Sequence, residues 1–203
     1  MSIKTKTILA ALGLLLVGTS GLLAQQLEIA PFYGYRFGGE VRNPLTGRAY
    51  GFQDSEAYGL VLDLPLKYSP GKLELLWSRQ DSSVDLQGLA GVGRVDVTID
   101  QIQIGGIMET GDQRFCEYVA VLVGATVYDT EDYGSDTRFS MGLGVGGKYF
   151  LTPKLALRAD VRGFCTIVDA SGAFISSGGS TVVAYNGTGV WQGEATLGLS
   201  LSF

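Results

Sequence analysis

The sequence contains no histidine at all. Histidine is the side chain that most often acts as a general base near neutral pH, because its pKa lies there. Its absence weighs against the acid–base chemistry on which many hydrolases and acyltransferases depend. No paired carboxylate or lysine arrangement stands out in its place. We therefore expect a protein that is not an enzyme and that uses no cofactor.

Positive charge and long apolar runs are also scarce. The formal net charge is −5, and loss of Lys4 and Lys6 with a leader would make it two charges more negative. Nucleic-acid binding depends on Lys and Arg that neutralise phosphates, so we expect no nucleic acid as a partner. Beyond the leader, no apolar run reaches the 18 or more residues that indicate a transmembrane helix.

The first 24 residues have the pattern of a secretory signal peptide. Lys4 and Lys6 give a positive start, residues 8–17 are apolar, and small residues end the segment at Ala24. An uncleaved membrane anchor is the alternative, but the apolar run is short for a span. We expect residues 1–24 to be removed and residues 25–203 to form one domain.

Alternation of apolar and polar residues is abundant, together with 30 glycines. Residues 139–163 show it best, as two strands joined by a tight turn at 151–154. Successive strand residues point to opposite faces, so each strand has one apolar and one polar face. A soluble sandwich that buries the apolar face would show the same pattern.

The same alternation predicts eight strands. They cover residues 26–37, 56–68, 72–79, 95–108, 115–128, 139–150, 155–165 and 191–203. The connections alternate between long and short, which is typical of a transmembrane barrel with short periplasmic turns and longer outer loops. We therefore predict an all-β fold, an eight-stranded antiparallel up-and-down transmembrane β-barrel. A secreted soluble barrel with its apolar faces inward is a further alternative.

Three local features complicate this pattern. Pro65 removes a ladder donor, and a bulge near the strand end would absorb it. The apolar residues of 95–108 change from odd to even positions, which predicts a one-residue bulge at Asp100-Gln101. Residues 115–128 are apolar on both faces, so their facing stays open.

The last third of the chain resembles the small outer-membrane β-barrel family, the group that includes the OmpA-type transmembrane domain. The similarity lies in the glycine-alternating strand at 142–149, the Leu151-Thr152-Pro153 turn, the strand at 155–162, and the alternating C-terminal strand that ends at Phe203. The resemblance implies that Phe203 is an assembly signal read by the outer-membrane assembly machinery. We expect no peptidoglycan-binding domain after this strand, so the resemblance does not imply that function of larger relatives.

Apolar stripes that face lipid turn the polar faces inward, into an interior that side chains of eight strands just fill. We predict a structural interior charge network, because unpaired buried charges are costly. Its predicted acids are Glu28, Asp63, Glu74, Asp100, Asp160 and Glu194, and its predicted bases are Arg36, Lys67, Lys148, Arg158 and Arg162. Glycines 142, 144 and 146 would leave room for the arginines. A narrow channel for ions or small solutes is the alternative role.

Two further sites are weighed and set aside. Four acids in residues 129–136 are loosely spaced like a calcium loop, but a solvated loop is the simpler interpretation, and we expect no metal site. Cys116 and Cys165 fall at opposite ends of the strand map, so we expect no disulfide. The Gly/Ser-rich residues 166–189 are predicted to form a long loop without an assigned role.

These observations predict a non-enzymatic, porin-like integral protein of the Gram-negative outer membrane, with a structural or surface-interaction role. The expected partners are outer-membrane lipid, lipopolysaccharide and the assembly machinery. We expect the protein to be a monomer.

Overall fold

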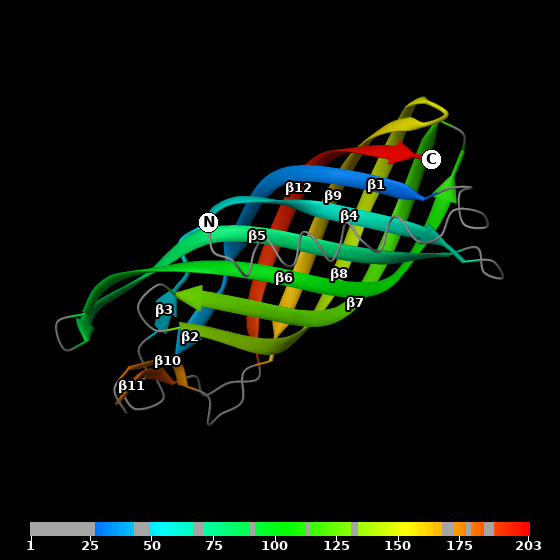
Figure 1. The fold of residues 1–203 in the computed structure, drawn as a ribbon. Coiled ribbons are helices and arrows are strands. Elements are labelled where there is room, and N and C mark those ends of the chain that lie inside the picture. The colour runs from blue at the N-terminus through cyan, green and yellow to red at the C-terminus, as the bar shows by residue number, and fades with distance from the viewer. Residues whose placement is uncertain are drawn as a thin grey trace.

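The computed structural model describes residues 27–42, 49–66, 71–89, 92–112, 114–130, 134–167, 173–177, 180–184 and 189–203. These residues form a closed antiparallel barrel with the strand order β1-β12-β9-β8-β7-β6-β5-β4 (Figure 1). The predicted fold class is therefore confirmed. Among the described residues, no helix is long and apolar enough to cross a membrane. The predicted leader, residues 1–24, lies outside the described residues.

Each barrel strand pairs with its neighbours along the chain, and the first strand pairs with the last. The barrel strands are β1 (Glu28–Gly38), β4 (Ser55–Pro65), β5 (Lys72–Leu89), β6 (Val92–Gly111), β7 (Phe115–Thr130), β8 (Gly134–Thr152), β9 (Leu155–Thr166) and β12 (Val190–Ser202). Two small hairpins lie at one end, β2 (Glu40–Arg42) with β3 (Ala49–Gly51) and β10 (Ala173–Ser177) with β11 (Ser180–Ala184). We call this the hairpin end, and the opposite end, which holds Glu28 and Ser202, the terminal end.

Buried and exposed residues alternate along the barrel strands as the pattern predicts. In β9, every second residue from Ala156 to Thr166 is buried, and the residues between them are more exposed. The facing of β7, which the sequence left open, follows the same rule: Tyr118, Ala120 and Leu122 are buried inside. The interior surface of the barrel therefore consists of one face from each strand.

The register fixes how the strands tilt. A row of paired residues that starts at Gly38 passes through Gln192, Phe164, Gly142, Leu122, Gly105, Glu74 and Asp63 and returns to β1 at Glu28. The row thus returns to β1 ten residues closer to the terminal end than where it began. A stagger of this kind goes with strands tilted by about 40° and with an interior that side chains fill.

The connections at the terminal end are short, and side chains stabilise two of them. The Thr152 hydroxyl accepts hydrogen bonds from the backbone N–H groups of Lys154 and Leu155 at 3.3 and 3.0 Å. The backbone N–H groups of Phe115 and Arg114 donate to the Asp112 carboxylate and lower the pKa of that carboxyl. Both side chains replace ladder bonds where the chain reverses.

The hairpin end is more ordered than the sequence predicted. Residues 80–94 were expected to be a loop, but most of them extend β5 and β6, and this hairpin projects beyond the other strands in Figure 1. The polar run that suggested a loop continues the ladder, with Gln80 opposite Ile99 and Val84 opposite Val95. The expected loops 38–55 and 166–189 contain β2–β3 and β10–β11. These segments form strands because their backbones pair, and the number of apolar residues in a segment does not indicate such pairing.

The predicted bulge at Asp100-Gln101 is wrong. The pairing of β6 with β5 is continuous through this point, and its only register shift lies between Asp85 and Leu89. The apolar residues change face without any change of phase: Ile99 faces inward, whereas Ile102 faces outward. The reason is that the surroundings of β6 change there. Toward the hairpin end, the apolar side chains Val95, Val97 and Ile99 are buried inside the barrel, whereas Ile102 and Ile104 are exposed on its outer wall. Pro65, for which a bulge was also expected, is the last residue of β4.

The two cysteines lie far apart, as the strand map predicted, and both thiols are free. Cys116 pairs with Lys148 on β8, and Cys165 pairs with Met141 on the same strand. Those two β8 residues are about 23 Å apart at about 3.3 Å per residue. A disulfide needs Cα atoms within about 7 Å, so this register cannot hold one.

Candidate functional site: the barrel interior and its hairpin end

The interior side chains form successive layers along the barrel. On β1, the inward residues run from Glu28 through Phe32 to Arg36, that is, charged, apolar and charged again. On β9, they run from Arg158 through Arg162 to Phe164 and Thr166. Neighbouring strands repeat the order, so the interior contains a charged layer at the terminal end, an apolar layer, a polar layer and an apolar cap.

Lys148 lies at the centre of the charged layer. Its ammonium donates to Glu28 at 2.5 Å, to Glu109 at 2.6 Å and to Asp63 at 2.9 Å, and its side chain is completely buried. The three carboxylates lie within 4.8 Å of one another, which is a spacing suited to a metal ion. The Lys148 ammonium already bonds all three, so an internal cation occupies the position between them. Lys72 adds a second cation, paired with Glu28 and Glu109.

Two arginines of β9 complete the charged layer. Arg158 donates to Asp63 at 2.8 Å and to Glu74 at 2.6 Å, while Arg162 donates to Glu74 at 2.6 Å. Both guanidinium groups also pair with Asp160 at 3.0 Å. Alternating acids and bases therefore cross the barrel from β4 and β5 to β9 without a gap. This is the arrangement in which buried charges are tolerated, because each has opposite charge and hydrogen bonds around it.

Tyr118 and the glycines of β8 fit around these charges. The Arg158 guanidinium lies 4.7 Å from the centre of the Tyr118 ring, and the Tyr118 hydroxyl donates to Asp160. A Cβ at Gly144 would lie 3.1 Å from Arg162, as the sequence suggested. Cβ atoms at Gly146 and Gly142 would instead meet Tyr118 and Phe164. The glycines thus make room for aromatic rings as well as for arginine.

An apolar layer, which was not predicted from the sequence, closes the barrel on the hairpin side of the charged layer. It is a cluster of six buried side chains from five strands: Ala30, Phe32, Val61, Leu76, Leu122 and Phe164. The signal was present, because the polar faces of the first three strands each carry one large apolar residue. Side chains that fill an eight-stranded barrel with apolar groups leave no continuous polar path along its axis.

A polar layer follows, built around a second ion pair. The Arg36 guanidinium lies 2.7 Å from Glu194, and both side chains are fully buried. Ser78 joins them, since it accepts from Arg36 at 2.6 Å and donates to Glu194 at 2.7 Å. The Arg36 guanidinium also lies 5.5 Å from the centre of the Phe164 ring, so it rests on the apolar layer. This pair joins β1, β5 and β12.

The hairpin end carries an apolar cap that includes part of the predicted polar connection 38–55. Phe52 stacks on Tyr128 of β7 with ring centres 5.8 Å apart, and it bridges to Val84 of β5. The backbone N–H of Phe52 donates to Gly39 at 2.9 Å. The buried apolar side chains of the cap are Tyr50, Phe52, Val84, Val95, Val97, Ile99 and Tyr128. The segment after β3 therefore covers this mouth of the barrel.

A polar groove lies beside this cap. Its volume is about 480 Å³, and its lining residues are Gln53, Ser55, Asp81, Ser82, Arg94, Asp96, Val97, Thr98 and Asp129. Within it, Thr98 donates to Asp81 at 2.9 Å and Arg94 donates to Gln53 at 2.5 Å. The groove offers three carboxylates and one guanidinium at the hairpin end.

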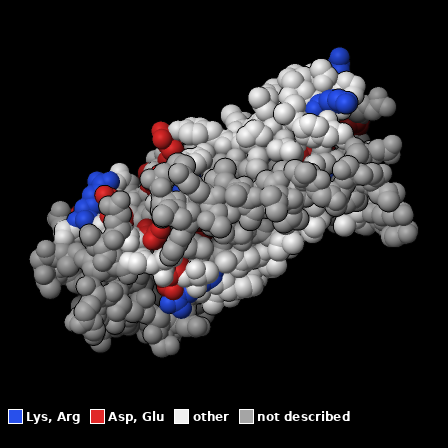
Figure 2. All heavy atoms as spheres, viewed as in Figure 1, with Lys and Arg blue, Asp and Glu red and all other residues white. Residues whose placement is uncertain are grey.

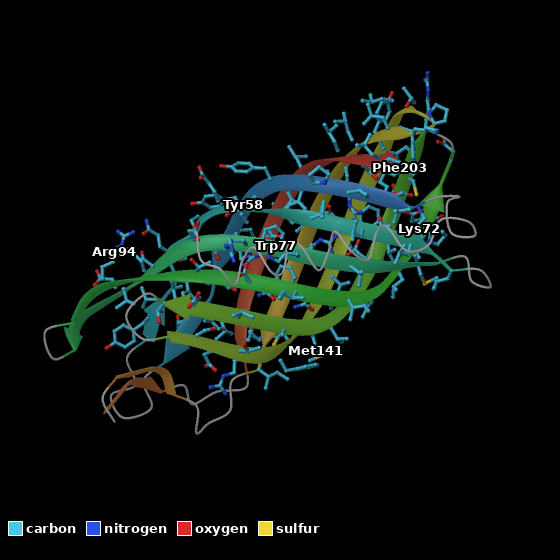
Figure 3. The ribbon with its side chains drawn as sticks, viewed as in Figure 1. Tyr58, Lys72, Trp77, Arg94, Met141 and Phe203 are labelled. Carbon is cyan, nitrogen blue, oxygen red and sulfur yellow. The ribbon has the colours of Figure 1, made fainter. Side chains whose placement is uncertain are left out.

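The outer wall of the barrel is apolar between the two ends. Leu143, Trp191 and Leu197 are 64, 69 and 70% exposed, although side chains of this size are usually buried in soluble proteins. In Figure 2, charged atoms on the visible described surface gather toward the two ends. Aromatic residues lie near both edges of the belt, for example Trp77 at one and Phe203 at the other (Figure 3). This is the profile of a wall that faces lipid.

Comparison with known proteins agrees with this architecture. No family model matches the chain, and no curated protein does. Among solved structures, the chain is similar to Neisserial surface protein A from Neisseria, with 13% identity, a TM-score of 0.61, and 87% of this chain and 97% of that chain covered. The fold is that of the small outer-membrane β-barrels. The outer-membrane protein OprG from Pseudomonas aeruginosa also matches, with 11% identity, a TM-score of 0.56, and coverage of 90% and 98%.

Within this outer-membrane barrel fold, the structure places most of the predicted charge network inside. The predicted residues found buried in the interior are Glu28, Arg36, Asp63, Glu74, Lys148, Arg158, Asp160, Arg162 and Glu194. Lys67 lies outside the described residues. The expectation for Asp100 is wrong, because it lies on the outer face, where Arg79 donates to it at 2.6 Å and Trp77 at 3.1 Å.

Two further charges of the described interior, Lys72 and Glu109, are not among the predicted residues. Alternation would have found both, since Lys72 shares a face with Glu74, and Glu109 shares a face with Gln103. Phe203 lies at the end of the outer face and is 60% exposed, and its backbone N–H donates to Leu27 at 3.0 Å. Its role as an assembly signal remains a prediction.

Proposed function

We propose that this chain is a non-enzymatic integral protein of the outer membrane, with a structural and surface-interaction role. The observation that carries the proposal is the apolar outer belt around an interior that contains the charges. Soluble monomers rarely expose contiguous apolar patches larger than a few hundred Å². In lipid, a closed barrel satisfies every backbone group, so the same belt is stable there. A soluble barrel that holds an apolar ligand would need the opposite arrangement of faces.

In this proposal, the terminal end faces the periplasm and the hairpin end faces outward, since short turns and long outer connections have this arrangement in such barrels. Residues 1–24 serve as the cleaved leader, and lipid, lipopolysaccharide and the assembly machinery are the partners. The polar groove and the hairpins β2–β3 and β10–β11 then form the surface that other molecules meet.

The layered interior supports the structural role over the channel alternative. Phe32, Leu76, Leu122 and Phe164 meet across the barrel between the two charged regions, and Phe52 covers the mouth. A permeant ion would have to cross both apolar layers without water, which is costly. The absence of histidine, together with the pairing of the interior charges, supports the non-enzymatic part of the proposal.

Two measurements on one refolded sample test the proposal. We expect the boiled and unboiled protein to migrate differently on a denaturing gel, because a closed barrel resists detergent. We expect no steady conductance when the same sample is added to planar bilayers. Steady single-channel currents from heat-modifiable protein would favour the channel. Identical migration, together with recovery in the soluble periplasmic fraction, would contradict membrane insertion itself.

A further inference from the structure

The apolar belt is tall on one side of the barrel. On β12, the outward residues from Trp191 to Phe203 include no charged side chain. This stretch spans about 30 Å along the barrel axis, at about 3.3 Å per residue and a strand tilt of about 40°. The outward residues of β9, from Leu155 through Cys165, are likewise uncharged. On this side the belt matches the hydrocarbon thickness of an ordinary bilayer.

The belt is about half as tall on the opposite side. On β6, the outward apolar stretch runs only from Ile102 to Met108, with Asp100 and Thr110 as the next outward residues. That stretch spans about 15 Å along the barrel axis by the same geometry. On β5, Arg79 follows Trp77 on the outer face. We call this wall of β5 and β6 the short sector.

The register shows that the two sides also differ in level. Phe139 on β8 pairs with Ala125, which pairs with Ile102, which pairs with Trp77 on β5. This row descends toward the terminal end across three strand spacings of about 4.8 Å, so Trp77 lies about 9 Å lower than Phe139. Trp191 on β12 pairs with Cys165, which pairs with Met141 on β8, two residues from Phe139. The descent along this row nearly equals the rise from Met141 to Phe139, so Trp191 lies within about 2 Å of the level of Phe139.

The upper edge of the short sector is held by fixed polar contacts. Arg79 donates two hydrogen bonds to Asp100, at 2.8 and 2.6 Å, and the Trp77 indole donates to the same carboxylate at 3.1 Å. The Arg79 guanidinium lies 5.8 Å from the centre of the Trp77 ring, and Tyr58 packs edge-on against that ring. Figure 3 shows Tyr58 and Trp77 beside each other on the outer wall. These contacts hold the guanidinium at this level, so it does not extend freely toward water.

We propose that the short sector is a contact surface for locally thinned bilayer, whose headgroup level descends on this side to meet Arg79, Asp100 and Trp77. The inference rests on the membrane insertion proposed above and deepens it. A bilayer adapts to a short apolar wall by thinning, at a modest cost per Å. In a flat bilayer whose surface lies at Trp191, Trp77 would lie about 9 Å deep, Arg79 about 5 Å deep and Asp100 about 2 Å deep. This polar edge would then be drawn into the hydrocarbon, where a charge costs more the deeper it lies. Short or compressible lipid chains are therefore the partner that fits this wall.

The two tryptophans of the chain allow a direct test, because one lies on each side. The variants Trp77→Phe and Trp191→Phe each leave a single tryptophan in the refolded full chain. Their fluorescence is measured in phosphatidylcholine vesicles whose acyl chains carry bromine at defined depths. We expect Trp77 and Trp191 to report the same shallow depth, despite their difference of about 9 Å along the barrel.

A tilted barrel in a flat bilayer would also bring both tryptophans to one depth, so the lower edge needs its own probe. In a background that lacks both tryptophans, Met108→Trp and Phe203→Trp report on the short and the tall side. Thinning predicts that both are shallow. A tilt would make Met108→Trp markedly deeper than Phe203→Trp, and this would overturn the inference.

A charge variant tests whether the polar edge sets the level. We expect Arg79→Leu/Asp100→Leu to let Trp77 move several Å deeper. The matched control is Arg94→Leu/Asp96→Leu, an outward ion pair within β6 that lies beyond the belt; its partners are 3.7 Å apart and 63 and 86% exposed. We expect no change in depth for that control.

The outcomes separate the two proposals. Suppose that Trp77 is about 9 Å deeper than Trp191 in the single-tryptophan variants that keep Arg79 and Asp100. The protein is then inserted but the bilayer is flat, and only the thinning inference fails. An equal shift in Trp77 depth for both charge variants would also overturn the role of Arg79 and Asp100. If no brominated lipid quenches either tryptophan, membrane insertion fails and the inference fails with it.

Discussion

Replacement of Lys148 by methionine tests whether the interior charges stabilise the barrel. In the described interior of the terminal half, five carboxylates (Glu28, Asp63, Glu74, Glu109 and Asp160) face four cations (Lys72, Lys148, Arg158 and Arg162). The variant raises this imbalance from one negative charge to two. Removal of one partner from a buried ion pair costs about 3–5 kcal/mol.

The contacts of Lys148 place the expected loss at the low end of that range. Glu28 and Glu109 keep Lys72 as a partner, and Asp63 keeps Arg158 at 2.8 Å. No carboxylate is left without a cation. We therefore expect a loss of about 3 kcal/mol in the free energy of unfolding, which corresponds to about a 150-fold change in the unfolding equilibrium.

Denaturant unfolding of the refolded protein in lipid vesicles, followed by tryptophan fluorescence, measures this loss. The matched control is Lys154→Met, since Lys154 is exposed in the turn between β8 and β9. We expect the control to change stability by less than about 0.5 kcal/mol. Adding Asp63→Asn to the Lys148 variant removes one excess carboxylate and should recover part of the loss. If Lys148→Met costs no more than the control, the charged layer does not stabilise the fold in the way described.

Three other predictions can be checked independently. Deletion of Phe203 should leave refolding in detergent largely intact, since burial of one phenylalanine contributes only about 1.5–3 kcal/mol, but it should lower outer-membrane levels in cells; normal surface levels would leave Phe203 an ordinary edge residue. Cys116 and Cys165 should both react with a thiol reagent in denaturant without reductant, and two unreactive thiols in a monomer would contradict the register of β7, β8 and β9. Phe52→Ala should destabilise the apolar cap and make the segment around it more accessible to added protease, while the unboiled protein still migrates as a closed barrel; unchanged protease resistance would show that the Phe52–Tyr128 stack does not hold the cap.

Alternation along the chain was enough to predict the barrel and the facing of most of its strands. In residues 157–163 of β9 and 191–197 of β12, small or apolar outward residues alternate with polar inward residues without interruption. Arg158 and Arg162 could therefore be placed inside before any contact was known. The partners of each charge could not be predicted, because they depend on which strands meet across the barrel. Arg158 bonds Asp63 and Glu74, which lie 95 and 84 residues away in sequence.

Predictions from the sequence were wrong where the surroundings of a strand change along its length. Ile99 and Ile102 are equally apolar, but one packs in the cap and the other faces the belt, so a change of apolar face resembled a bulge. Asp100 lies between them on the outer face, where Arg79 makes a carboxylate tolerable. Residues 80–94 contain too few apolar residues to indicate a strand, since beyond the belt the ladder is held by backbone bonds. The hydrophobic pattern indicates whether a side chain faces lipid, water or the barrel interior. In this protein those surroundings change along single strands, so one strand does not keep one pattern.

The pairing of β1 with β12 has a consequence for the order of assembly. The Ser200 hydroxyl bonds Glu28 across 172 residues of sequence, and Arg36 bonds Glu194 across 158. Until the last strand has been synthesised, β1 therefore has a free edge and Glu194 is missing from its ion pair. Contacts between residues so distant in sequence form late and slowly, because the chain between them must first be ordered. We therefore expect the barrel to close only after the whole chain has been synthesised, and the unclosed chain to depend on protection from aggregation until its two ends meet.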